Sequence, residues 1–190
     1  MKNIAVFVSG SGSNAENLFT YFSGSDVAKV NVLFSNKKEA YALDRAERLG
    51  LEAIVFDRDD FYYSSRVLDE LKNRKIDYIV LAGFLWLLPA ELIAAYPGRI
   101  LNIHPALLPK YGGKGMYGDR VHRAVIEAGE TESGITIHRV NEQYDSGDIV
   151  FQATVAVTPE DTPESLATKI HELEYEHFPK IVEQEISKKS

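Results

Sequence analysis

The chain has 190 residues, 45% of them apolar and 26% charged, a length and composition that suit one soluble domain over residues 1–190 with a sizeable core. A net charge of −7 argues against nucleic acid or a membrane surface as partner, whereas an anionic small molecule needs only a local cluster of donors. The lack of cysteine excludes disulfides, thiol nucleophiles and Cys-ligated zinc. It is compatible with the cytoplasm, where we expect this protein.

Strand and helix patterns alternate through the first half of the chain. The apolar run at residues 4–8 is too short for a signal peptide or a membrane span, and it predicts the first strand. Further strands are predicted over residues 30–34, 53–56, 78–82 and 100–103. Helices are predicted over residues 14–22, 38–49, about 60–74 and 89–96, with Gly50 as a C-terminal cap of the second. This alternation is typical of a mostly parallel sheet covered on both faces.

The character of the chain changes after residue 104. Residues 105–120 predict a loop rich in glycine, proline and lysine, which leads into a helix over 120–128. Residues 134–140 and 149–157 predict an antiparallel strand pair, and a final amphipathic helix is expected over about 163–185. The predicted fold is therefore α/β, with a Rossmann-like, mostly parallel sheet flanked by helices and an antiparallel pair toward the C-terminus.

The loop between the first strand and the first helix has the sequence Ser-Gly-Ser-Gly-Ser-Asn, at residues 9–14. Glycines let the backbone turn tightly, and the N-terminus of the next helix offers free N–H groups to a phosphate. The pattern lacks the Lys-Ser/Thr of a Walker loop and the spacing of a dinucleotide loop. An ordinary tight turn is therefore the alternative.

Asn102 and His104 lie two residues apart on the fifth predicted strand, just before a proline. Two residues at this spacing point to the same face of a strand, and ligands of open α/β sheets gather at the carboxyl ends of the strands. An amide donor and an imidazole in one pocket suit acyl transfer to an amine supplied by the substrate. Either residue alone has a structural alternative, as a turn cap or a buried histidine. Asp145 precedes Ser-Gly, which is also common turn chemistry.

Together these segments resemble the folate-dependent formyltransferase family over nearly the whole chain. The resemblance is carried by residues 8–14, 33–37, 80–84, 101–111 and 134–147. The Asn-Ile-His-Pro run at 102–105, followed by the Asp-x-Gly turn at 145–147, is specific to this family. The short length and the Gly-Ser loop resemble those of the branch of this family that acts on phosphoribosylglycinamide.

The resemblance implies a one-carbon transferase of de novo purine biosynthesis. It implies that 10-formyltetrahydrofolate, as co-substrate, gives its formyl group to the amine of 5′-phosphoribosylglycinamide. No metal is expected, because the formyl group is already activated and the leaving group is an aryl amine. The expected partners are these two small molecules, and the expected assembly is a monomer or homodimer. Residues 1–100 would form the nucleotide and phosphate side, and residues 101–190 the catalytic and folate side.

The resemblance also assigns residue roles. Asn102 would donate to the oxyanion, His104 would act as an imidazolium or shuttle protons, and Asp145 would hold the imidazole and favour its charged form. The expected nucleotide-binding residues are Gly10, Ser11, Gly12, Ser13, Asn14, Pro105, Lys110 and Glu174. The expected folate-binding residues are Arg66, Leu85, Trp86, Leu87, Leu88, Asn102 and Tyr144.

Two segments depart from the family pattern. Trp86 stands where many members carry an arginine. The loop at residues 112–119 is longer than the usual Pro-Gly turn, and its glycines and lysine suggest a lid over the nucleotide.

Three other functions remain open at this point. One is formyl transfer to methionyl-tRNA or a sugar-nucleotide amine, although those enzymes usually carry extra domains and the tRNA enzyme needs a basic surface. A second is hydrolysis of 10-formyltetrahydrofolate, which normally comes with an added regulatory domain. The third is a nucleotide-binding module in which Asn102 and His104 are structural.

Overall fold

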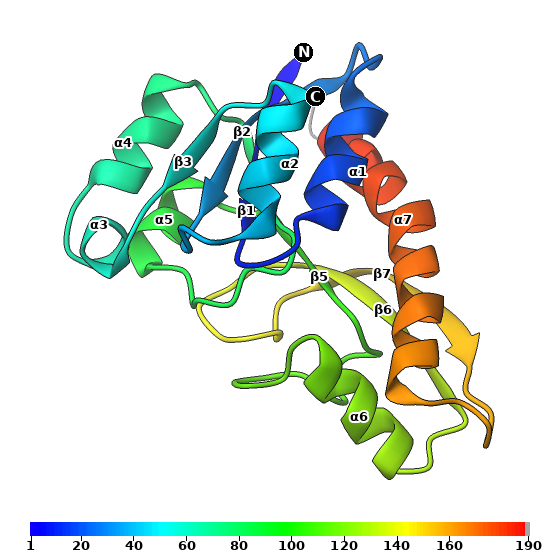
Figure 1. Ribbon diagram of the computed structural model, residues 1–190. Coiled ribbons are helices and arrows are strands. Elements are labelled where there is room, and N and C mark those ends of the chain that lie inside the picture. The colour runs from blue at the N-terminus through cyan, green and yellow to red at the C-terminus, as the bar shows by residue number, and fades with distance from the viewer. Residues whose placement is uncertain (189–190) are drawn as a thin grey trace.

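The computed structural model describes residues 1–188, in which one sheet has the strand order β3-β2-β1-β4-β5-β6-β7 (Figure 1). Neighbouring strands from β3 to β5 run parallel, whereas the β5–β6 and β6–β7 pairs are antiparallel. The predicted mostly parallel α/β sheet with an antiparallel pair near the C-terminus is thereby confirmed. The strands are β1 (Lys2–Val8), β2 (Ala28–Ser35), β3 (Ala53–Val55), β4 (Tyr78–Leu81), β5 (Ile100–His104), β6 (Glu132–Arg139) and β7 (Ile149–Ala156).

Helices cover both faces of the sheet, as the apolar strands predict. Successive side chains of a strand point to opposite faces, so Val6 packs into one buried cluster and Phe7 into the other. The first cluster lies under α1, α2, α6 and α7, and the second under α3, α4 and α5. The helices are α1 (Ser13–Phe22), α2 (Tyr41–Leu49), α3 (Arg58–Tyr62), α4 (Arg66–Asn73), α5 (Ala90–Ala95), α6 (Asp119–Glu127) and α7 (Pro163–Lys188).

The helix predicted over about 60–74 is wrong in one respect, because it is two helices, α3 and α4. Serine side chains account for the break between them. Ser64 Oγ donates to the Asp60 carbonyl at 3.0 Å and accepts from the Arg66 N–H at 3.3 Å. Serine hydroxyls that bond to nearby backbone groups compete with the helical ladder. The second predicted helix begins only at Tyr41 but ends at Gly50 as expected, with φ +65°.

The order in which successive strands are added to the sheet reverses between β1 and β4. β2 and β3 lie on one side of β1, whereas β4, β5 and the antiparallel strands lie on the other. Ligands of open α/β sheets bind near such a switch point, outside the carboxyl ends of the strands. Here the Ser9 N–H donates to the Gly83 carbonyl at 3.0 Å, and Ser9 Oγ accepts from the Leu85 N–H at 3.0 Å. The loops after β1 and β4 are therefore bonded to each other at this end of the sheet.

Candidate active site

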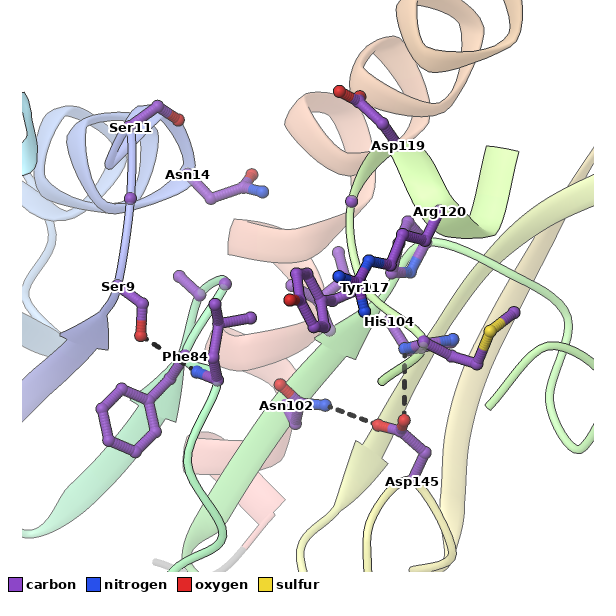
Figure 2. A pocket seen from close by; sticks show the side chains of 18 of the residues that line it. Ser9, Ser11, Asn14, Phe84, Asn102, His104, Tyr117, Asp119, Arg120 and Asp145 are labelled. Atoms are coloured by element: carbon purple, nitrogen blue, oxygen red, sulfur yellow. Dashed lines mark hydrogen bonds and ion pairs between the residues drawn. The ribbon is translucent and has the colours of Figure 1, made fainter. Parts of the chain in front are cut away.

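A pocket of about 590 Å³ lies at the carboxyl ends of β1, β4 and β5. The loop at 9–14 and residues 82–85 form one side of it, and residues 102–105 also line it. Tyr117, Asp119, Arg120 and Asp145 lie on the opposite side (Figure 2), and Tyr144 and the rest of residues 113–120 also line the pocket. The pocket therefore joins the two chemically suggestive segments of the sequence, the Gly-Ser loop and the Asn-x-His strand.

The structure brings Asn102, His104 and Asp145 together, as predicted. Asn102 Nδ2 donates to Asp145 Oδ1 at 3.4 Å, and His104 Nδ1 lies 3.5 Å from Asp145 Oδ2 (Figure 2). Asn102 and His104 both face the pocket from β5, in keeping with their spacing of two. Asp145 reaches them from the connection between β6 and β7. One carboxylate thus touches both the amide and the imidazole.

Each nitrogen of the His104 imidazole has a polar neighbour. Nε2 lies 2.7 Å from the Tyr111 carbonyl oxygen, which can only accept, so this distance assigns the proton of the neutral ring to Nε2. Nδ1 is then the basic nitrogen, and it faces Asp145. The side chain is only 4% exposed. Burial lowers the pKa of His104 below its ordinary value of 6.5, even though Asp145 and the Tyr111 carbonyl both act to raise it.

This charge state bears on the role predicted for His104. Asp145 does favour the imidazolium of His104, but desolvation outweighs that attraction and the pKa falls. The resting imidazole at neutral pH is therefore neutral. Of the two predicted roles, this state suits a proton shuttle better than a permanent imidazolium.

Two residues that contact His104 adopt unusual backbone conformations. Asp145 has φ +50° and Tyr111 has φ +56°, and Lys75 is the only other non-glycine residue with positive φ within residues 1–188. Such conformations cost on the order of 1–3 kcal/mol each and persist only where surrounding contacts enforce them. Their position on either side of one histidine indicates a site shaped for function.

The carboxylate of Asp145 is ionised at neutral pH. Burial acts to raise its pKa, but the contact with His138, the charge that His104 acquires at acidic pH and the Gly113 N–H together hold the pKa below its usual value. The Gly113 N–H donates to Oδ2 at 3.0 Å. Asp145 therefore also fastens the loop at 112–119 to the reaction centre.

His138 is a site residue that the sequence analysis missed. It pairs with Asn102 across the β5–β6 ladder, and its Nε2 lies 3.0 Å from Asn102 Nδ2. His138 Nδ1 lies 3.1 Å from the Arg139 carbonyl, so Nδ1 carries the proton and Nε2 accepts from Asn102. The signal in the sequence was a histidine amid the buried positions of β6. Only the strand register shows that this histidine fixes the orientation of the Asn102 amide.

The loop at 9–14 has the geometry expected of an anion site. Gly12 has φ +73°, and a Cβ at this position would lie 2.5 Å from Cβ of Ala42, so only glycine fits. No side chain caps α1, which leaves the N–H groups of its first turn free for a ligand. Gly10, Ser11, Gly12, Ser13 and Asn14 all line the pocket.

Glu174 on α7 lies beside this loop, although 160 residues separate it from Asn14. Asn14 Nδ2 donates to Glu174 Oε2 at 2.9 Å, and His171 Nδ1 lies 3.0 Å from the same oxygen. The hydrogen bond to Glu174 raises the pKa of His171. Glu174 therefore lines the pocket next to the loop at 9–14, and Pro105 lines the same pocket.

Of the predicted folate-side residues, Leu85 and Tyr144 line the pocket together with Asn102. Leu88 is buried in the core under α5, and the Leu87 carbonyl accepts from the Tyr62 hydroxyl at 2.8 Å. Trp86 packs under the Arg58 guanidinium, whose Cζ lies 4.9 Å from the ring centroid. These three predicted folate-side residues are not among those that line the pocket.

Two predicted cations lie outside the pocket lining. Lys110 Nζ pairs with Glu130 at 3.0 Å, and Arg66 pairs with Asp60. The cations that line the pocket are instead Lys37, Lys114 and Arg120, with Arg120 Cζ 4.9 Å from the ring centroid of Tyr117. The loop at 112–119 thus contributes charge to the pocket, which the composition of that loop suggested.

Within residues 1–188, no group of three or more His, Cys, Asp or Glu side chains is placed to hold a metal ion. In the same part of the chain, none of the helices is both long and apolar enough to cross a membrane.

The protonation state of His104 gives a testable pH dependence. Because its pKa in the folded protein lies below 6.5, the unfolded chain takes up this proton at higher pH than the folded one. We expect its contribution to stability to be complete above pH 6.5 and lost as the pH falls. NMR titration of the ring should give a pKa below 6.5, and lower still in Asp145→Asn, which removes the charge that raises it. A pKa above 6.5 in the parent protein would contradict this assignment.

Comparison with known proteins gives a consistent result. A family model described as formyl transferase matches residues 2–182. A chloroplastic phosphoribosylglycinamide formyltransferase of Arabidopsis thaliana is 44% identical over 187 residues, which are 95% of this chain and 64% of that protein. The phosphoribosylglycinamide formyltransferase of Haemophilus influenzae is 39% identical over 187 residues, which are 96% of this chain and 86% of that protein.

A solved structure is similar over nearly the same length. Glycinamide ribonucleotide transformylase 1 from Symbiobacterium toebii superposes with a TM-score of 0.89 at 32% identity. The match covers 98% of this chain and 88% of that one. The present chain spans less than two thirds of its plant relative but most of its bacterial ones.

Proposed function

Because this chain belongs to the formyl transferase family, we propose that it transfers the formyl group of 10-formyltetrahydrofolate to the amine of 5′-phosphoribosylglycinamide. The products are the N-formyl nucleotide and tetrahydrofolate, in de novo purine biosynthesis. The observation that carries the proposal is one pocket that holds both an uncapped helix N-terminus and the Asn102–His104–Asp145 cluster. The names of the relatives favour the same reaction.

The two ends of the pocket suit the two substrates. The phosphate of the nucleotide binds at the loop of residues 9–14, and Glu174 accepts hydrogen bonds from the sugar hydroxyls. The folate ring lies among the lining residues Phe84, Leu85, Ile103 and Tyr144, which supply the apolar and aromatic surface that such a ring needs. Single-domain organisation, a monomer or homodimer and a cytoplasmic location remain predictions from the sequence.

The reaction forms one C–N bond and breaks another. The substrate amine attacks the formyl carbon, and negative charge develops on the formyl oxygen. Asn102 Nδ2 donates to this oxygen, and loss of one such donor typically costs about 10²–10³ in rate. To donate to this oxygen, the Asn102 amide gives up its longer hydrogen bond, the one to Asp145 at 3.4 Å. The contact with His138 keeps the side chain in place.

His104 moves the proton. The neutral imidazole takes a proton from the attacking amine at Nδ1, because Nε2 is already bonded to the Tyr111 carbonyl. Asp145 stabilises the imidazolium that forms. The same proton then passes to N10 of the folate as the bond from N10 to the formyl carbon breaks. A neutral histidine and an ionised aspartate are the resting states that this sequence of steps requires.

The test is a spectroscopic assay of tetrahydrofolate formation from a 10-formyl folate, with and without phosphoribosylglycinamide. Product is expected only with the nucleotide, and it should be lost in His104→Ala but not in His177→Ala. His177 is a suitable control because it packs against Phe151, away from the pocket. Product without the nucleotide would instead indicate a hydrolase. Nucleotide binding without product, unchanged in His104→Ala, would indicate a binding module.

The loop at 112–119 gives a further prediction. Lys114 faces the pocket and has no hydrogen-bond or ion-pair partner within the described chain, so a bound phosphate nucleotide supplies its missing counter-charge. We expect phosphoribosylglycinamide to slow tryptic cleavage after Lys114 by about tenfold, because ordering a loop removes the open state that proteases attack. Cleavage after the exposed Lys188 should not change and serves as the internal control. Equal cleavage after Lys114 with and without the nucleotide would exclude a lid role.

A further inference from the structure

We propose that Arg45, on the side of α2 that faces α1, is a positioning residue that holds the loop at 9–14 in its phosphate-binding shape. This inference rests on the proposed function of that loop. Arg45 Nε donates to the Ser11 carbonyl oxygen at 2.9 Å, and Nη1 pairs with Glu16 in the first turn of α1. Arg45 does not line the pocket. It therefore acts on a ligand only through the loop and α1.

The direction of the Ser11 carbonyl decides what the loop offers to an anion. In a trans peptide the C=O and the following N–H point in opposite directions. Fixing the Ser11 oxygen toward Arg45 therefore aims the Gly12 N–H away from α2. This N–H donates to no acceptor in residues 1–188, so it is available to a ligand. If this peptide turned over, a carbonyl oxygen would face the phosphate and repel it.

The adjacent peptide is held in the same way. The Ala42 N–H, at the start of α2, donates to the Gly10 carbonyl at 3.1 Å. Two successive carbonyls of the loop are thus bonded by α2, which lies beside α1 (Figure 1). A Ser-Gly-Ser-Gly segment has no side-chain bulk of its own to prevent a peptide from turning. The restraint must come from α2, and Arg45 is its only side chain that bonds to the loop.

Arg45 is itself well placed for this task. Its guanidinium stacks on Tyr41, with Cζ 5.0 Å from the ring centroid, and its side chain is only 24% exposed. A planar guanidinium serves the carbonyl and the Glu16 carboxylate at once, which a lysine ammonium does less well. Arg48 stacks on the same tyrosine at 5.5 Å but makes no hydrogen bond to the loop in the described chain, so it provides a matched control.

The experiment compares Arg45→Met, Arg45→Lys and Arg48→Met with two acceptors, phosphoribosylglycinamide and its phosphate-free riboside. For Arg45→Met we expect kcat/KM with the phosphorylated acceptor to fall about tenfold through KM, the range of one lost charge-assisted hydrogen bond. kcat, the KM for the folate and kcat/KM with the riboside should stay within about twofold. Arg45→Lys should recover only part of the loss, and Arg48→Met should match the parent protein.

Three outcomes would overturn this role. Equal losses with both acceptors would show general damage to the fold, and no loss would show that the loop holds its shape unaided. Complete recovery in Arg45→Lys would show that positive charge, not the geometry of the guanidinium, is what matters. Calorimetric binding of phosphoribosylglycinamide, about tenfold weaker in Arg45→Met, gives the same comparison without turnover. Absence of formyl transfer by the parent protein would overturn the proposed function and leave this binding comparison intact.

Discussion

Replacing Asp145 with asparagine is expected to lower turnover by about 10²–10⁴-fold, the range typical of lost acid–base assistance. Asp145 uses one oxygen for Asn102 and the other for the Gly113 N–H and His104. Asparagine keeps only one acceptor oxygen, so its NH₂ must face another donor. It also lacks the charge that stabilises the imidazolium of His104.

The Asp145→Asn variant should keep the fold. Asparagine tolerates the positive φ of this position as well as aspartate does, so the backbone of the turn has no new strain. The measurement is kcat at saturation with both substrates, together with the unfolding midpoint. Asp148→Asn is the matched control, because it removes an equal charge from an exposed position of the same connection. Turnover near that of the parent protein in Asp145→Asn would contradict the assigned role.

The second large effect is expected for Gly147→Ala. A Cβ at Gly147 would lie 1.6 Å from the Arg139 carbonyl oxygen, far inside contact distance. The backbones at Gly147 and Arg139 lie this close because the Arg139 N–H donates to the Asp148 carbonyl at 2.9 Å where β6 and β7 meet. The backbone must shift to admit the methyl group, and Asp145 lies two residues away.

We expect Gly147→Ala to destabilise the protein by about 3 kcal/mol, the upper range for overpacking, which corresponds to a fall of roughly 6–12 °C in Tm. Turnover should fall by more than the loss of folded protein would cause, because the displaced turn carries Asp145. Denaturant unfolding and the formyl transfer assay would measure the two effects. Gly24→Ala is the control, since a Cβ there meets nothing within 4 Å. An unchanged midpoint in Gly147→Ala would mean that the connection is freer than its contacts indicate.

Much of the architecture was predictable from local sequence patterns. Continuous apolar runs identified the strands, and a period of two placed Asn102 and His104 on one face of β5. The break between α3 and α4 was missed, because serine hydroxyls there replace helical bonds that the apolar pattern alone implied. The Gly-Ser loop and the Asn-x-His strand were each recognisable by themselves, since each is a short contiguous segment.

The placement of distant side chains was not predictable in the same way. Glu174 lies against Asn14, and His138 against Asn102, only because the strand order and the course of α7 bring them together. Resemblance pointed to Lys110 and Arg66, but a position in the chain does not set the direction of a flexible side chain. Both of these cations lie beside carboxylates outside the pocket lining.

The sequence by itself determined the elements of this protein and their alternation, because hydrophobic period and turn chemistry are local properties of the chain. It also supplied the candidate groups Asn102, His104 and Asp145, the last through resemblance to a family. The tertiary structure decided the charge of that centre. His104 is the last residue of β5, and it contacts the turns at Tyr111 and Asp145. Burial there lowers the pKa of His104 more than the nearby carboxylate raises it. Burial depends on every segment that packs around a group, so the protonation state of His104 is a property of the whole fold.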